Sequence, residues 1–182
     1  SAPGSLSSVD SAVCTGTGTN LILSGTSGNI TWQKTTNFNN GVPTPTSWVS
    51  VTGSSTVSTY STGALATTSA YRAIITVGSC TAVFTNPRII YVDQLSIAGT
   101  ASLNTGTDLT VCEGGSKVLK VVGNQGLINW QSSTNGGVNW ADVTNATTAV
   151  YTFTNIVANT SYRARIKRGV CQSVFSNAIA IV

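Results

Sequence analysis

Histidine and methionine are absent from the sequence, and charged side chains are scarce. Charged residues make up 8% of the 182 positions, against roughly a quarter in an ordinary soluble protein. The acids are Asp10, Asp93, Asp108, Glu113 and Asp142. General acid–base catalysis without histidine needs carboxylates that work in pairs, and five acids spread over the whole chain offer little material for a pair. We therefore expect a protein that is not an enzyme.

Long apolar runs and metal-binding spacings are also missing. No apolar run approaches the roughly 18 residues that predict a transmembrane helix, so we expect no membrane span in this chain. None of the four cysteines belongs to a CxxC pair, the spacing typical of a zinc site. Asp93 stands alone rather than in the cluster of oxygen ligands that calcium requires. The sequence therefore predicts no metal ion and no cofactor.

The chain consists of two tandem copies whose landmark residues recur in the same order. These landmarks are a cysteine, a tryptophan followed by glutamine, a second tryptophan, a Tyr-Arg-Ala segment and a second cysteine. In the first copy they are Cys14, Trp32, Trp48, Tyr71 and Cys80, and in the second Cys112, Trp130, Trp140, Tyr162 and Cys171. The one large difference is the interval between the tryptophans, 16 residues in the first copy and 10 in the second. The copies comprise residues 1–92 and 93–182, each of a size typical of one domain.

Each copy has the pattern of a β-sandwich. Apolar and polar residues alternate in short segments such as 30–33 and 128–131, which is typical of half-buried strands. No segment shows a helical period, and each copy contains about seven such strands separated by turn residues. Trp32 and Trp130 occupy the position of the core tryptophan of immunoglobulin (Ig) domains. We therefore predict an all-β protein with two tandem Ig-like β-sandwich domains.

The four cysteines indicate an oxidising compartment, outside the cytosol. Four cysteines allow three pairings, and the repeat favours one disulfide in each copy, Cys14–Cys80 and Cys112–Cys171. In the usual Ig topology, however, the two positions lie at opposite ends of the sandwich. Either the first strand brings Cys14 beside the last strand, or the strand order differs.

The order of cysteine, glycine, an apolar strand, Trp-Gln, an NGG-x-x-Trp hairpin, Tyr-Arg-Ala and Gly-x-Cys resembles Ig-like repeats of very large secreted proteins of Bacteroidetes. These proteins include gliding-motility adhesins exported by the type IX secretion system. The resemblance covers both copies. It implies a non-catalytic part of a surface adhesin, an extracellular or cell-surface location, attachment to surfaces or polysaccharide, and further repeats of the same chain. Such repeats also serve as structural spacers and as carbohydrate-binding accessory modules of secreted enzymes, and both alternatives remain open.

Two kinds of aromatic residue are candidates for binding. Phe38 belongs to segment 36–47, which makes the first copy six residues longer than the second between the tryptophans. Insertions of this kind lie in surface loops, where binding residues are common. Trp48 and Trp140 follow a turn and begin a strand, so they either pack against the sheet or offer a ring on which a sugar stacks.

A basic set of residues is the other candidate. If Tyr162 points inward, then Arg163, Arg165 and Lys167 share the outer face of their strand. This stripe, which the first copy lacks, would attract an acidic polysaccharide. Nucleic acid is not expected as a partner, because the compartment is wrong and no aromatic residue is expected on that outer face to stack on bases.

One segment resembles a glycosidase-associated motif. Residues 133–140 match the Asp-box pattern S-x-D-x-G-x-x-W except that Asn135 replaces the aspartate. The Asn-Gly pair within it is a strong signal for a tight turn. We interpret the segment as a turn.

Overall fold

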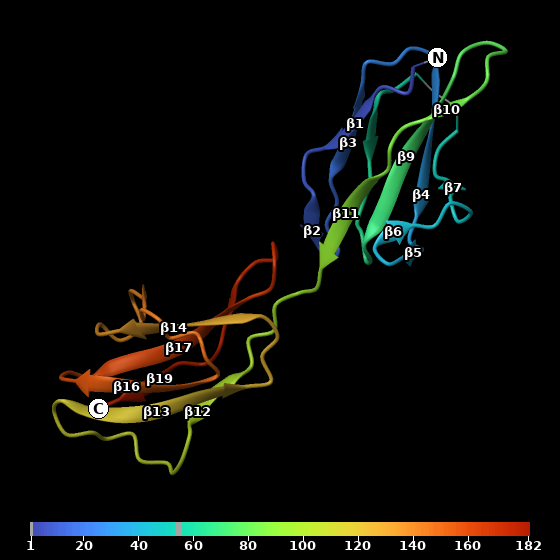
Figure 1. Ribbon diagram of the computed structural model, residues 1–182. Helices are drawn as coiled ribbons and strands as arrows, with labels where there is room; N and C mark the ends of the chain where they lie inside the picture. The colour runs from blue at the N-terminus through green and yellow to red at the C-terminus, as the bar shows by residue number, and fades with distance from the viewer. Residues whose placement is uncertain (1, 54–55) are drawn as a thin grey trace. The chain divides into compact units, whose positions relative to one another are not determined.

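The computed structural model describes residues 2–53 and 56–182, and in these residues all regular structure is β-strand. The chain divides into two compact units, Ser1–Asp93 and Gln94–Val182, called here the first and the second domain (Figure 1). No helix long and apolar enough to span a membrane occurs in the described residues.

The first domain is a sandwich of two sheets with a small extra hairpin. One sheet has the order β1 (Ser5–Ser8), β3 (Asn20–Ser24), β8 (Thr59–Ser61). The other has the order β2 (Ala12–Cys14), β11 (Arg88–Asp93), β9 (Ser69–Thr76), β4 (Asn29–Thr35), β7 (Val49–Ser50), and β10 (Val83–Phe84) also pairs with β9. The hairpin joins β5 (Phe38–Asn39) to β6 (Val42–Pro43).

The second domain repeats this arrangement. Its first sheet has the order β12 (Thr100–Leu103), β13 (Gly115–Val122), β16 (Val150–Ile156). Its second sheet has the order β15 (Ala141–Asp142), β14 (Leu127–Ser133), β17 (Thr160–Lys167), β18 (Val174–Phe175), and β19 (Ile179–Ile181) also pairs with β17. The segment that corresponds to the β5–β6 hairpin is the short turn between β14 and β15.

Alternating residues of the central strands build the core. Along β17 the side chains of Tyr162, Ala164 and Ile166 are buried, whereas Arg163 and Arg165 are only half-buried. This confirms the predicted inward and outward faces, because successive residues of a strand point to opposite sides of the sheet. The outer face is the one that carries the candidate site.

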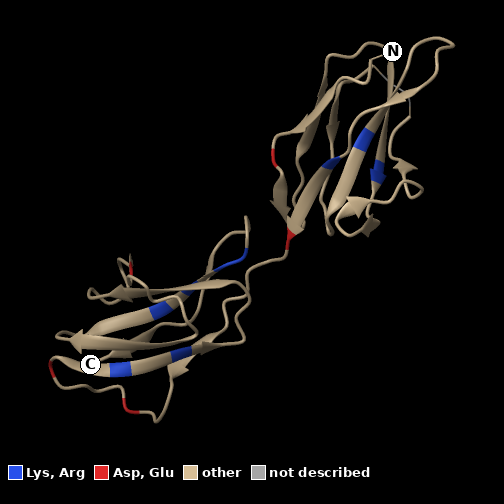
Figure 2. Cartoon of the chain, in the orientation of Figure 1, with Lys and Arg blue, Asp and Glu red and all other residues tan. Residues whose placement is uncertain are grey.

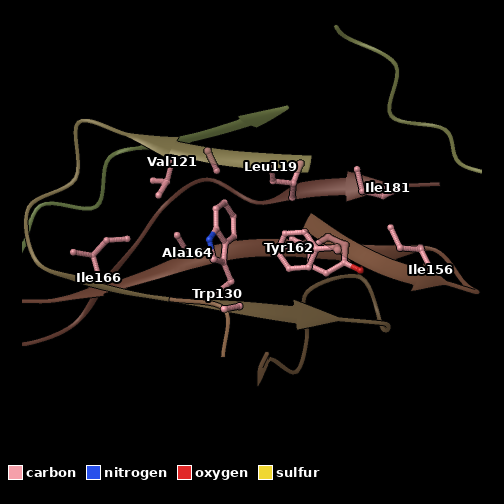
Figure 3. Packing of buried hydrophobic residues seen from close by; sticks show 11 residues of the cluster. Leu119, Val121, Trp130, Ile156, Tyr162, Ala164, Ile166 and Ile181 are labelled. Carbon is pink, nitrogen blue, oxygen red and sulfur yellow. The ribbon is translucent and has the colours of Figure 1, made fainter. Parts of the chain in front are cut away.

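The two core tryptophans lie between the sheets, as predicted. Trp32 is 1% exposed and Trp130 is 0% exposed. Figure 3 shows the ring of Trp130, from β14, directed toward the strand that carries Leu119 and Val121. Its Nε1 donates a hydrogen bond to the Thr148 carbonyl at 3.0 Å, so the polar edge of the indole is satisfied inside the core.

The first strand of each domain changes from one sheet to the other. In the first domain β1 pairs with β3, and β2 then pairs in parallel with β11, which places Cys14 opposite Asp93. In the second domain Val111 donates to the Val182 carbonyl at 2.9 Å, which places Cys112 at the corresponding end. Of the two alternatives left open by the sequence, the first is therefore correct: Cys14 lies beside the last strand.

The predicted disulfide within each domain is wrong. Cys14 lies beside the end of β11. Because β11 and β9 are antiparallel, β9 starts at this same end of the sheet, whereas Cys80 follows the end of β9. Strand β9 has eight residues, so about 26 Å separate its ends, and a disulfide needs Cα atoms within about 7 Å. The eight-residue strand β17 separates Cys112 from Cys171 in the same way. Cys80 and Cys112 are free and exposed, while Cys14 and Cys171 are disulfide-bonded.

Candidate functional site

An arginine held between two aromatic rings dominates the outer face of the second domain. The guanidinium carbon of Arg163 lies 4.1 Å from the ring centroid of Trp140 and 3.9 Å from that of Phe175. Its Nε donates a hydrogen bond to Oε1 of Gln131 at 2.9 Å. The strand pairing explains the arrangement, because Gln131 on β14 is the direct neighbour of Arg163 on β17. We call Trp140, Arg163 and Phe175 the arginine stack of this domain.

Hydrogen bonds connect the stack to an ion pair on the neighbouring strands. Gln131 donates through Nε2 to Oδ1 of Asp142 at 2.8 Å, and the other carboxylate oxygen of Asp142 accepts from Nη2 of Arg165 at 2.8 Å. Asp142 is thus shared by Gln131 and Arg165. The polar groups of this part of the sheet are consequently bonded to one another.

The first domain contains the same stack without the ion pair. Arg72 lies 4.4 Å from the ring centroid of Trp48 and 4.5 Å from that of Phe84, and its Nε donates to Gln33 at 2.8 Å. The position of Asp142 is taken by Ser50, which accepts a longer bond from Gln33 at 3.5 Å. Ile74 stands where the second domain has Arg165. The stack is therefore common to both domains, and the ion pair belongs to the second alone.

Burial lowers the pKa of both stacked arginines, Arg72 and Arg163, because an apolar environment disfavours their charged form. Arginine nevertheless remains charged at any physiological pH. A stacked guanidinium presents its planar faces to the rings and one N–H to glutamine. These faces are consequently occupied within the protein, and the sheet gains cation–π contacts.

The three residues of the predicted basic stripe have different environments. Arg163 is in the stack, Arg165 is paired with Asp142 in a salt bridge, and Lys167 is exposed at the end of β17. The next residue, Arg168, donates through Nη1 to Gln125 at 3.0 Å. Figure 2 marks the few positions in each domain at which a charged residue stands. Of the three predicted stripe residues, Lys167 is the one that lies open to solvent.

The insertion with Phe38 forms an ordered hairpin. Phe38 on β5 pairs with Pro43 on β6 and is half-buried. The neck of the hairpin is closed by Thr44, whose backbone N–H and hydroxyl both donate to the Asn37 carbonyl, at 3.0 and 2.8 Å. Phe38 is thus held by local bonds in a position that the second domain lacks.

The turn after β14 is also fixed by local hydrogen bonds. Oδ1 of Asn135 accepts from the Ser133 hydroxyl and from the Asn139 N–H, both at 2.9 Å. Trp140 donates through Nε1 to the Gly137 carbonyl at 2.8 Å, which orients its ring toward Arg163. The Asp-box-like segment is therefore a turn, as predicted, and it positions a ring of the stack.

A shallow depression lies beside this turn and recurs in the first domain. In the second domain Ser132, Asn135, Asn139 and Trp140 contribute to its lining. In the first domain Lys34, Asn37, Ser47 and Val49 line the corresponding depression. Of the predicted candidates, Trp140 lines one of these two depressions, whereas Arg163, Arg165 and Lys167 line neither.

Sequence reasoning missed the stack, although a signal was present. Arg72 and Arg163 each follow the shared tyrosine, and Phe84 and Phe175 each stand four residues after the shared cysteine. The recurrence of a cation and two aromatic residues at outward positions could have predicted their contact. In residues 2–53 and 56–182, no group of three His, Cys, Asp or Glu side chains could hold a metal ion.

Solved structures with the same architecture are Ig-like. Murine CEACAM1b has a TM-score of 0.60 and 15% identity over 98% of this chain and 99% of that one. A marsupial T cell receptor has a TM-score of 0.56 and 12% identity over 97% of this chain and 71% of that one. Domains A168–A170 of titin have a TM-score of 0.54 and 12% identity over 93% of this chain and 61% of that one. At such identities the likeness shows the fold, a pair of Ig-like β-sandwiches.

No curated protein sequence is similar to this chain at a significant level. A family described as a domain of unknown function (DUF8696) matches residues 2–94 and again residues 97–182. The two matches together cover nearly the whole sequence. The chain therefore belongs to this family and carries two copies of its domain.

Proposed function

We propose that the chain is a non-catalytic pair of repeats from a long secreted or cell-surface adhesin, and that it attaches to polysaccharide. The family match to both copies, the Ig-like fold and the disulfide-bonded cysteines support this proposal. Many cell-surface domains use this sandwich, and disulfides persist in oxidising compartments. The resemblance to Bacteroidetes repeats supplies the more specific part: export by type IX secretion and a role in gliding motility.

The observation that carries the proposal is the recurring depression beside the turn after β4 and β14. Each depression is shallow and combines polar side chains with apolar ones, Trp140 and Ala141 in the second domain and Val49 and Val51 in the first, so a single site would bind weakly. A polysaccharide, however, repeats its sugar units along its length. An array that repeats the site can engage several units at once, and avidity then exceeds the affinity of one site by a large factor.

Two residues outside the depressions would add specificity. Lys167 supplies an exposed positive charge at the end of β17, which favours an acidic polysaccharide. Phe38 supplies a half-exposed ring on the hairpin of the first domain. Both residues differ between the copies, so each would distinguish one domain from the other.

Binding to immobilised polysaccharides tests the proposal. The intact chain is passed over a uronic-acid polymer and a neutral glucan, beside the variants Lys34→Ala, Asn139→Ala, Lys167→Ala and Phe38→Ala. We expect binding of the wild type and a several-fold loss with Lys34→Ala and Asn139→Ala. Lys120→Ala removes the same charge on the other sheet and serves as the matched control. Absence of wild-type binding to every polymer would refute attachment through these two repeats.

A structural spacer is the second candidate. The bonded network of Arg163, Gln131, Asp142 and Arg165 favours it, because a sheet face whose polar groups satisfy one another gains less from a ligand. The sequence that flanks these repeats in the full-length gene bears on both candidates. Many further repeats support an adhesin or its stalk, whereas an adjoining catalytic domain would point to an accessory module.

A further inference from the structure

Each domain carries one cysteine at either end of its sandwich. Cys14 and Cys112 follow the first strand, beside the end of the last strand. Cys80 and Cys171 lie in the loops after β9 and β17, at the opposite end. We call these the first-strand cysteine and the loop cysteine. A strand of eight residues separates them, so they cannot bond to each other within one domain.

The two loop cysteines are held in the same backbone turn. The Cys80 N–H donates to the Val77 carbonyl at 3.0 Å, and the Cys171 N–H donates to the Arg168 carbonyl at 3.0 Å. The glycine two residues earlier has a φ of 51° at Gly78 and 50° at Gly169. Cys171 is disulfide-bonded and Cys80 is free. The backbone around Cys80 thus has the same turn as the backbone around Cys171, the equivalent residue, which forms a disulfide.

The first-strand cysteines are also alike. The Cys14 carbonyl accepts from the Thr17 N–H at 2.9 Å, and the Cys112 carbonyl accepts from the Gly115 N–H at 2.8 Å. Cys14 is disulfide-bonded, and Cys112 is free and exposed. Each kind of cysteine therefore occurs once in a disulfide and once as an exposed thiol in a matching turn.

From these observations we propose that Cys80 and Cys112 are cross-linking sites through which further copies of this repeat are attached by disulfide bonds. A loop cysteine bonds to a first-strand cysteine, so the link runs head to tail. The partner is another copy of the repeat, because such a domain offers the complementary cysteine in the complementary turn. Each chain carries one free cysteine of each kind, so links to different copies extend a linear array, whereas two copies that form both links with each other close into a dimer. The proposal stands independently of polysaccharide binding.

The reaction is the oxidation of two thiols. Cys80 of one copy and Cys112 of another lose two protons and two electrons and form one S–S bond. The electrons pass to a disulfide oxidant, such as glutathione disulfide, which is reduced to two thiols by thiol–disulfide exchange. Both thiols are exposed, so neither domain has to unfold for the exchange.

Mixing two single-cysteine variants tests the direction of linkage. Cys80→Ser keeps the first-strand thiol Cys112, and Cys112→Ser keeps the loop thiol Cys80. The two chains, one carrying a mass tag, are mixed at about 1 mM, comparable to the effective concentration a short tether provides. Glutathione disulfide is then added. We expect mixed dimers with a Cys80–Cys112 bond, identified by peptide mass spectrometry, well above the statistical share for two equally reactive thiols.

Three results would contradict the proposal: a statistical mixture of dimers, an excess of like-with-like dimers, or glutathionylated monomers alone. Wild-type chain treated in the same way should form a ladder of multimers on a non-reducing gel that collapses on reduction. The variant with both substitutions, Cys80→Ser and Cys112→Ser, should remain monomeric. A ladder formed by this double variant would show that the linkage uses other cysteines.

Discussion

Arg163 and Arg72 illustrate how the neighbouring side chains determine the role of a single residue. Each is a cation on an outer sheet face, and each is stacked between a tryptophan and a phenylalanine. The guanidinium of arginine is planar and weakly hydrated, so it suits stacking better than the ammonium of lysine. The two arginines therefore contribute primarily to the stability of their domains.

Substitution of Arg163 by alanine should destabilise the second domain by about 2 kcal/mol, since it removes two cation–π contacts and a hydrogen bond from a charged donor. Arg163→Lys should recover less than half of this loss. Denaturant unfolding of the intact chain measures the effect. Arg165→Ala is the control and should cost less than about 1 kcal/mol, because its ion pair is partly exposed. Equal losses for Arg163→Ala and Arg165→Ala would show that the stack contributes nothing beyond charge.

Tyr71 should make the first domain sensitive to alkaline pH. Burial raises the pKa of its phenol to about 12, with a smaller contribution from Tyr60. A phenol whose pKa is higher in the folded state holds its proton while the unfolded chain loses it. Its stabilising contribution is therefore complete below about pH 10 and is lost as pH rises toward 12. Tyr71→Phe should remove that part of the alkaline destabilisation and leave stability at neutral pH nearly unchanged.

Tyrosinate absorbance during titration measures this prediction, with thermal unfolding recorded at neutral and alkaline pH. The wild type minus Tyr71→Phe difference should titrate near pH 12. Tyr91→Phe is the control, because Tyr91 is 56% exposed. A difference that titrates at the ordinary pKa of an exposed tyrosine would be inconsistent with a buried phenol.

At the scale of elements, the turn after β14 illustrates how local bonds position a distant contact. Asn135 accepts two hydrogen bonds that close the turn, and the turn directs Trp140 onto the arginine stack. The sequence predicted this turn from its Asn-Gly pair and its Asp-box-like spacing. It did not reveal the partner of the tryptophan ring, because that partner comes from another strand.

Asn135→Ala should destabilise the second domain by about 1–2 kcal/mol, because the Asn139 N–H and the Ser133 hydroxyl both lose their acceptor. Asn135→Asp should be nearly neutral, because a carboxylate oxygen accepts the same bonds. Both variants can be compared by denaturant unfolding and by the near-ultraviolet signal of the tryptophans. If Asn135→Asp were as damaging as Asn135→Ala, the role of the amide would not be that of an acceptor.

The first strand shows where element prediction was incomplete. Up to Cys14 the structure has two short strands, β1 and β2, which pair with different sheets. Alternation along such short segments indicates a strand but contains no information about the partner strand. Only the packing of the whole sandwich decides that β2 lies beside β11.

At the scale of the whole molecule, the oxidation states of the four cysteines provide a direct check of the topology. Alkylation of the native, unreduced chain should modify Cys80 and Cys112 and leave Cys14 and Cys171 unmodified until the protein is reduced. Peptide mass spectrometry identifies the modified sites. Disulfides within each domain, as the sequence alone suggested, would instead protect all four cysteines.

The sequence by itself determined the class of fold, the two-domain organisation and the inward face of each central strand. These properties follow from the periodicity of apolar residues and from a repeat, and both can be counted along the chain. The tertiary structure alone decided the disulfide state, the arginine stack and the exposure of Lys167. Those features depend on which strand ends meet and which outward side chains become neighbours across a sheet. Such proximity arises from strand pairing between residues far apart in sequence.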